Sequence, residues 1–181
     1  MTNDGPKAWL AGGSSPASGD AQRFRAELTD AAPAVRRFLF GLCGDWHLSE
    51  DLSQEALLSA WRKRSSFNGR ASLKTWIFAI ARNHWLTNLR QKVRRPSEQP
   101  VNENCQISPM DGPEAAASRG ELGQAVAAAL GRLPAEQREA LSLRELGGLS
   151  SSQVAEVLNL PVGTVKSRLR YAMLKLAREL E

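Results

Sequence analysis

Residues 149–177 read LSSSQVAEVLNLPVGTVKSRLRYAMLKLA, and this stretch decides the fold of the C-terminal half. A short amphipathic segment ends in the turn Asn-Leu-Pro at 159–161, and a longer basic segment follows it. Apolar residues recur at helical spacing in both segments, and the small Ala155 allows two helices to cross closely. The pattern predicts a helix-turn-helix whose second helix begins with the proline of the turn and Gly163.

The outward side of that second helix is polar and basic. An α-helix fits the major groove of DNA, where its outward side chains reach base edges and phosphates. The candidate residues here are Thr164, Lys166, Ser167, Arg168, Arg170 and Tyr171. An ordinary helical hairpin with a solvated basic face would share the periodicity. The turn, the small residue and the basic face together favour DNA binding.

Helical periodicity also fills most of the remaining chain, and strand-like alternation is absent from the sequence. Ser49, followed by two acidic residues, is a predicted N-cap, and a long helix is predicted to begin near Leu73. We therefore predict an all-α fold made of two small helical domains, over residues 21–95 and 119–181.

Two segments lack this periodicity. Residues 1–20 are rich in Gly, Ser, Pro and Ala, and residues 96–118 contain several prolines, few apolar residues and mostly acidic charge. The first is predicted to be a flexible N-terminal tail and the second a flexible acidic linker between the domains.

Positive charge is concentrated between Arg62 and Arg95. Of the 24 Lys and Arg residues of the chain, ten fall in this segment, which contains no acidic residue, so 14 remain against 19 acidic residues elsewhere. The segment also carries aromatic rings, of which Phe78 and Trp85 are expected to pack in the core. This uneven distribution of charge indicates a polyanionic partner for one surface, and nucleic acid is the leading candidate.

Four polar residues of this segment, Asn83, Thr87, Arg90 and Arg94, fall at i, i+4, i+7 and i+11, with Trp76 two turns earlier. They are predicted to form a track along one face of the long helix. Asn can read a base edge, Thr can contact a base or the backbone, and Arg can bind phosphate.

The helix expected over 49–63 has two different sides. One carries the apolar Leu52, Ala56 and Ala60, and the other carries Asp51, Gln54, Glu55, Leu58 and Arg62. A leucine among acidic and amide groups is unusual for a purely solvated face and indicates a protein-docking surface. An ordinary solvated helix face is the alternative.

Three stretches together resemble a known family. GLSSSQVAEVLNLPVGTVKSRLRYA, at 148–172, resembles promoter-reading region 4 of bacterial RNA polymerase sigma factors, especially the extracytoplasmic-function (ECF) group. SEDLSQEALLSAW, at 49–61, resembles the polymerase-binding helix of sigma region 2. FNGRASLKTWIFAIARNHWLTNLR, at 67–90, resembles the region 2 segment that melts promoter DNA.

The resemblance implies an ECF-type sigma factor that binds core RNA polymerase, directs it to promoters and nucleates promoter opening. The C-terminal recognition helix would read the −35 element of duplex promoter DNA. The N-terminal domain would bind the −10 element and the melted single strand through Phe67, Asn68, Arg70, Lys74, Trp76, Asn83, Thr87, Arg90 and Arg94. The docking side of the 49–63 helix would bind the clamp helices of the largest polymerase subunit. The resemblance also implies an anti-sigma factor as a partner.

Other classes of function find less support. The sequence shows no nucleophile-base arrangement or phosphate-binding loop, and Cys43 and His47 have no further ligand near them, so no enzyme, cofactor or metal is expected. No apolar run approaches membrane-spanning length and no signal peptide is evident, so we expect a cytoplasmic protein without membrane insertion. Two rivals remain: a helix-turn-helix repressor or activator that binds duplex DNA without being a polymerase subunit, and an RNA-binding or antitermination protein.

Overall fold

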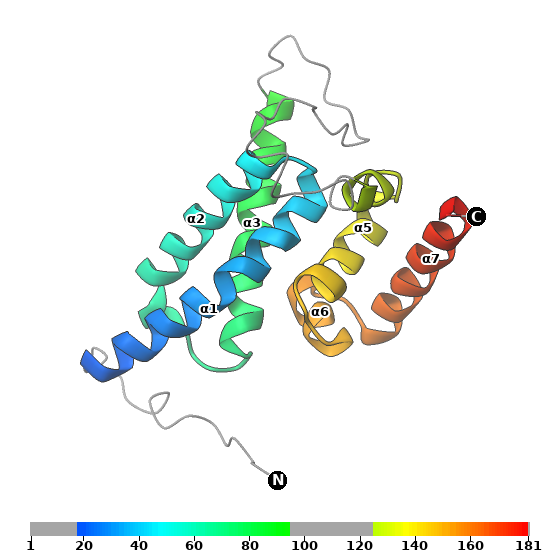
Figure 1. The fold of residues 1–181 in the computed structure, drawn as a ribbon. Helices are drawn as coiled ribbons and strands as arrows, with labels where there is room; N and C mark the ends of the chain where they lie inside the picture. The colour runs from blue at the N-terminus through cyan, green and yellow to red at the C-terminus, as the bar shows by residue number, and fades with distance from the viewer. Residues whose placement is uncertain (1–17, 95–124, 181) are drawn as a thin grey trace.

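The computed structural model describes residues 18–94 and 125–180, and these ranges contain helices and no strand. The N-terminal range holds α1 (Ser18–Cys43), α2 (Trp46–Arg62), the 3-10 turn η2 (Arg64–Ser66) and α3 (Leu73–Arg94). The C-terminal range holds a helix over 125–131, α5 (Ala135–Leu141), the π-helical turn η3 (Ser142–Leu146), α6 (Ser151–Leu158) and α7 (Val162–Leu180). The predicted all-α class is confirmed (Figure 1).

Some predicted segments lie outside these ranges. The acidic linker at 96–118 is not among the described residues, nor is the predicted tail up to residue 17. The last three residues predicted for the tail belong to α1, which begins at Ser18.

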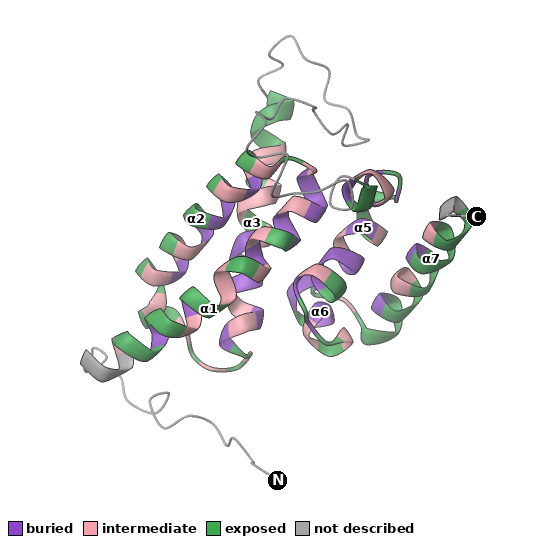
Figure 2. Ribbon diagram, viewed as in Figure 1, coloured by how far each residue is buried: buried purple, intermediate pink, exposed green. Residues whose placement is uncertain are grey.

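The first three long helices pack around a core of large apolar side chains. Phe38 of α1 and Phe78 of α3 are both fully buried, with ring centroids 5.5 Å apart. Ala56 and Ala60 of α2 are also fully buried, because their small side chains let α2 approach the other helices closely. The sides of α1, α2 and α3 that face one another are buried in Figure 2.

The start of α2 differs from the prediction. Ser49 is not the N-cap: it lies inside the helix, where it is buried and its hydroxyl donates to the Trp46 carbonyl at 2.7 Å. Asp45 is the cap, and its carboxylate accepts from the Leu48 amide at 3.0 Å. Gly44, with φ of 67°, ends α1 immediately before it. The helix therefore begins one turn earlier than the Ser-Glu-Asp sequence suggested.

The predicted helix-turn-helix is present as α6 and α7. Ser150 caps α6 in a capping box with Gln153, and Asn159 ends the helix in the left-handed conformation. Val154 and Val165 are fully buried between the two helices. This turn fixes α7 relative to α6 and leaves one side of α7 in solvent.

The two helical groups pack directly against each other. Their shared apolar core runs from α1, α2 and α3 into η3 and α6, and a smaller cluster lies among Leu130, Leu133, Leu141 and Ala172. The side chains of Ser142 and Leu146 in η3 lie against Gly41 of α1. The sequence predicts two helical bundles joined by a linker, and among the described residues the two bundles share one apolar core.

Candidate nucleic-acid interface

The polar track on α3 is exposed to solvent. Asn83, Thr87, Arg90 and Arg94 are all exposed, and the Thr87 hydroxyl donates to the Asn83 carbonyl at 2.9 Å. Helical spacing places the four side chains along one side of α3, as predicted. The arrangement offers an amide for a base edge and two guanidinium groups for phosphates.

An aromatic pair lies at the start of α3. The rings of Phe67 and Trp76 are 5.3 Å apart, and the Trp76 ring also meets that of Phe24 at 6.3 Å. Both members of the pair are half-buried. Packing therefore holds both rings in place, and each residue keeps some exposure to solvent.

The loop before α3 is ordered by local contacts. The Asn68 side chain accepts from the Arg70 amide at 3.2 Å, and Gly69 adopts a φ of 70° between them. Asn68 and Arg70 are exposed. Both residues thus lie in a defined turn that directly follows Phe67 in the chain.

Lys74 is already bound within the chain. Its ammonium donates to the Gly148 carbonyl at 2.7 Å and lies 6.0 Å from the centre of the Phe78 ring. Lys74 is one of the predicted DNA contacts, but its ammonium is occupied here by a backbone carbonyl of the C-terminal half, a contact that the sequence does not reveal.

The outward side of α7 matches the predicted recognition surface with one exception. Thr164, Lys166, Ser167, Arg170 and Tyr171 are exposed. Arg168 instead forms an ion pair with Glu136 at 2.6 Å, and its side chain is only 21% exposed. Arg168 therefore joins α7 to α5 in this arrangement.

The predicted docking side of α2 is exposed along its length. Asp51, Gln54, Glu55, Leu58 and Arg62 all face solvent, and Leu58 is 55% exposed. The opposite side, with Leu52, Ala56 and Ala60, is buried. The division of α2 into two sides is as the sequence indicated.

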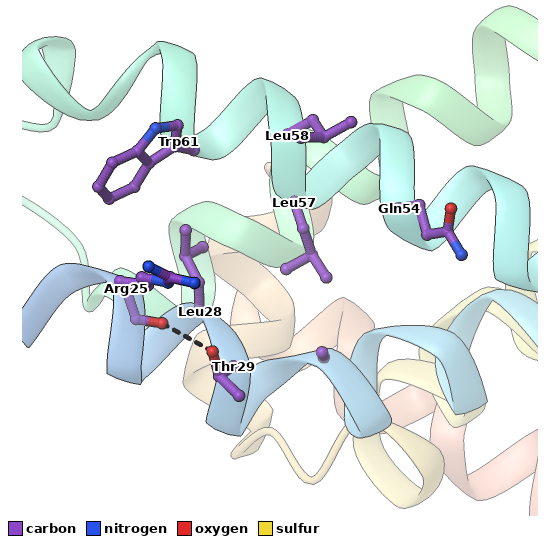
Figure 3. Close-up of a pocket in the computed structure, with 8 residues that line it drawn as sticks. Arg25, Leu28, Thr29, Gln54, Leu57, Leu58 and Trp61 are labelled. Atoms are coloured by element: carbon purple, nitrogen blue, oxygen red, sulfur yellow. Dashed lines mark hydrogen bonds between the residues drawn. The ribbon is translucent and has the colours of Figure 1, made fainter. Parts of the chain in front are cut away.

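A groove of about 580 Å³ runs beside this face, between α1 and α2. Figure 3 shows Leu57 and Trp61 pointing from α2 toward α1, with Leu58 on the outer side of α2. The lining residues are Arg25, Leu28, Thr29, Ala32, Gln54, Leu57, Leu58 and Trp61. Gln54 and Leu58 are among the predicted site residues, whereas the other lining residues are not, because helical periodicity does not say which helix packs beside α2.

Two polar contacts fix α2 against its neighbours. Arg36 of α1 donates to Glu50 at 2.9 Å, and this hydrogen bond lowers the pKa of the Glu50 carboxyl. His84 of α3 lies 2.9 Å from the Ser59 hydroxyl through Nε2 and 3.5 Å from the Glu55 carboxylate through Nδ1. Glu55 of the docking side is thereby connected to the helix that carries the polar track.

Neither a metal site nor a membrane-spanning helix is found among the described residues. In 18–94 and 125–180, no three His, Cys, Asp or Glu side chains gather as a metal site would require. Within the same ranges, no helix is long and apolar enough to cross a membrane. Cys43 is buried and its thiol donates to the Asp45 carbonyl at 3.1 Å.

Comparison with known proteins gives matches over both helical groups. The family model for sigma-70 region 2 matches residues 28–95, and that for sigma-70 region 4 matches residues 123–176. The ECF RNA polymerase sigma factor EcfG of Rhodopseudomonas palustris is 32% identical over 160 residues, which cover 84% of this chain and 82% of EcfG. The RNA polymerase sigma-H factor of Pseudomonas aeruginosa is 35% identical over 129 residues, 67% of each chain.

A solved structure is similar over nearly its whole length. The sigma factor RpoE of Bartonella quintana, solved in complex with the anti-sigma factor NepR, aligns with a TM-score of 0.73 and 33% identity. The alignment covers 88% of this chain and 97% of RpoE.

Proposed function

The chain belongs to the ECF group of the sigma-70 family of RNA polymerase sigma factors, and on that basis we propose which of its surfaces perform each step of initiation. A sigma factor of this family binds core RNA polymerase and promoter DNA, and it acts as a non-enzymatic initiation factor. We infer that this chain itself has no enzymatic activity and that it acts in the cytoplasm with the polymerase.

We assign binding of the melted promoter strand to the domain at 21–95. The observation that carries this assignment is the exposed track of Asn83, Thr87, Arg90 and Arg94 on a helix that begins beside the Phe67–Trp76 ring pair. Melting of the promoter duplex costs base-pairing and base-stacking energy. Stacking of the unpaired bases on aromatic side chains, together with cationic contacts to the phosphates, offsets this cost. Asn68, Arg70 and Lys74 would contact the same strand near the start of α3.

We assign recognition of the upstream promoter element to the domain at 119–181. The exposed side of α7 would enter the major groove, where Lys166 and Arg170 can bind guanine edges or phosphates. Thr164, Ser167 and Tyr171 would contact neighbouring bases or sugars. Arg168 would take part only after leaving Glu136, or would act by holding α7 in place.

We assign polymerase binding to the exposed side of α2 and the groove beside it. Asp51 and Glu55 would meet basic groups on the clamp helices of the largest subunit, because opposite charges give the docking its orientation. Leu58 and the apolar groove would supply the buried centre that such an interface needs.

We also propose that an anti-sigma factor controls this chain. The support is the likeness to RpoE of Bartonella quintana, which was solved in complex with the anti-sigma factor NepR.

A conventional repressor or activator would need only the helix-turn-helix. It would leave unexplained both the exposed basic track on α3 and the match to sigma region 2. An RNA-binding protein would likewise have no use for a promoter-reading region 4.

The test is run-off transcription with purified core RNA polymerase on a promoter library. The expected result is transcripts that start at a shared sequence pattern and depend on the added chain. Absence of transcripts, together with failure of the chain to co-migrate with core polymerase, would refute the proposed function.

A further inference from the structure

A histidine of α3 bridges two residues of α2. His84 Nε2 lies 2.9 Å from the Ser59 hydroxyl, and His84 Nδ1 lies 3.5 Å from a carboxylate oxygen of Glu55. Glu55 and Ser59 are four residues apart, about one helical turn, so one ring can reach both side chains. The imidazole is therefore held at both of its nitrogen atoms.

The two contacts determine which nitrogen carries the proton. A neutral imidazole has one N–H donor and one acceptor nitrogen, whereas an ionised carboxylate can only accept. The proton therefore belongs on Nδ1, which faces Glu55, and Nε2 accepts a hydrogen bond from the Ser59 hydroxyl. Ser59 thus orients the ring, and the ring presents an N–H to the carboxylate.

Glu55 stays accessible to a partner in this arrangement. Its side chain is 64% exposed, whereas that of His84 is 28% exposed. A carboxylate has two acceptor oxygens, so a contact on one of them leaves the other for a cation of the polymerase. The neutral imidazole also leaves the negative charge of Glu55 in place for that encounter.

Asp51 offers a comparison on the same side of α2. It lies one turn before Glu55 and is also exposed. In the described part of the chain, the His84 ring contacts Glu55 and not Asp51. The two acidic residues therefore share the docking side and differ in their contact with α3.

Orientation of Glu55 before docking favours binding. A glutamate side chain that moves freely in solution loses rotamer freedom when an interface immobilises it. A side chain that another helix already holds has lost much of this freedom in the free chain. The cost per immobilised side chain corresponds to about a twofold to tenfold change in Kd.

We propose that His84 is a positioning residue for polymerase docking: its ring, oriented by Ser59, holds the Glu55 carboxylate in the geometry that a basic group of the polymerase meets. The proposal rests on the assignment of the exposed side of α2 to polymerase binding. It gives His84 a different role from its neighbour Asn83, which is exposed on the polar track of α3.

Substitutions of His84 separate positioning from packing. His84→Leu keeps a side chain of similar size but no donor, and His84→Asn is smaller but keeps an N–H donor near the place of Nδ1. We expect His84→Leu to raise the Kd for core polymerase by about twofold to tenfold and His84→Asn to keep most of the affinity. Thermal unfolding reports whether each variant is folded. The opposite order of affinities would show that the ring acts by packing alone, and this result overturns the proposal.

A double-variant cycle tests whether His84 acts through Glu55. Glu55→Gln removes the charge that the ring orients, so adding His84→Leu should change Kd by less than about twofold. Asp51→Asn is the matched background, because it removes a charge that His84 does not contact in the described structure. There, His84→Leu should cost as much as in the original chain. Equal losses in the two backgrounds overturn the proposal, as does an unchanged Kd for His84→Leu alone.

Ser59→Ala covers the case in which the His84 variants fail to fold. Alanine favours a helix, and this change leaves the imidazole in place while it removes the hydroxyl that orients the ring. Binding to core polymerase should weaken, and the loss should disappear in the Glu55→Gln background. An unchanged Kd, or a loss that persists in that background, refutes the positioning role.

The two proposals fail in different ways. If the original chain does not bind core polymerase, the proposed function is wrong. If it binds but Glu55→Gln and Asp51→Asn leave Kd unchanged, the docking side has been assigned to the wrong surface. If these two changes weaken binding and the His84 variants do not, only the positioning role is wrong.

Discussion

Truncation of Leu58 to alanine should weaken binding to core RNA polymerase without weakening the fold. Full burial of a leucine contributes about 1.5–3 kcal/mol. Leu58 is 55% exposed in the free chain, so docking can bury roughly the remaining half, worth about 1–1.5 kcal/mol. The expected loss is therefore about tenfold in Kd.

Titration of fluorescently labelled chain with core polymerase measures this loss, and thermal unfolding reports on the fold. Val93→Ala is the matched control, because Val93 is 68% exposed on α3, away from the docking side. It should leave Kd unchanged. Leu52→Ala, at a buried position of the same helix, should instead lower stability by about 2–5 kcal/mol. An unchanged Kd for Leu58→Ala would show that polymerase docks elsewhere.

Three further outcomes are expected. Lys166→Ala and Arg170→Ala should each weaken binding to duplex DNA with the upstream element, by about 1–3 kcal/mol where the side chain contacts a base. Binding to core polymerase should stay constant. A parallel loss of core binding in the titration would contradict the role of α7. Asn83→Ala should reduce promoter opening, seen as lower permanganate reactivity of bubble thymines, and equal reactivity would count against a base contact. The Arg36 hydrogen bond lowers the pKa of the Glu50 carboxyl from its ordinary value of 4.5. The pair therefore stabilises the fold at neutral pH. This stabilisation is lost when the pH falls below 4.5 and Glu50 becomes protonated in the folded chain. Acid denaturation should therefore show a shallower loss of stability in Arg36→Ala, and identical acid profiles would exclude the pair as a contributor.

Several features of the candidate sites follow from the sequence because they depend on neighbours within a few turns. The spacing of Asn83, Thr87, Arg90 and Arg94 sufficed to predict an exposed track, since a helix of 3.6 residues per turn brings them to one side. The capping box at Ser150 and the turn at Asn159 define the helix-turn-helix in the same local way. The Ser49 cap was wrong because Asp45 competes for the same helix start and Gly44 ends the preceding helix.

The arrangement of the helices was beyond the reach of local pattern. Trp61 and Arg25 line one groove, but only the packing of α1 beside α2 brings them together. Periodicity marks a face as apolar and leaves its partner undefined.

The sequence by itself determined most of the helices, the exposed basic side of α7 and the two sides of α2. Only the tertiary structure decided that the two halves share a core and that Lys74 is covered by the loop at Gly148. The physical reason is range: helix periodicity and capping act over a few residues, whereas Arg82 meets Glu139 across 57 positions of the chain. Such a contact depends on the fit of two finished surfaces, which no short segment of sequence specifies.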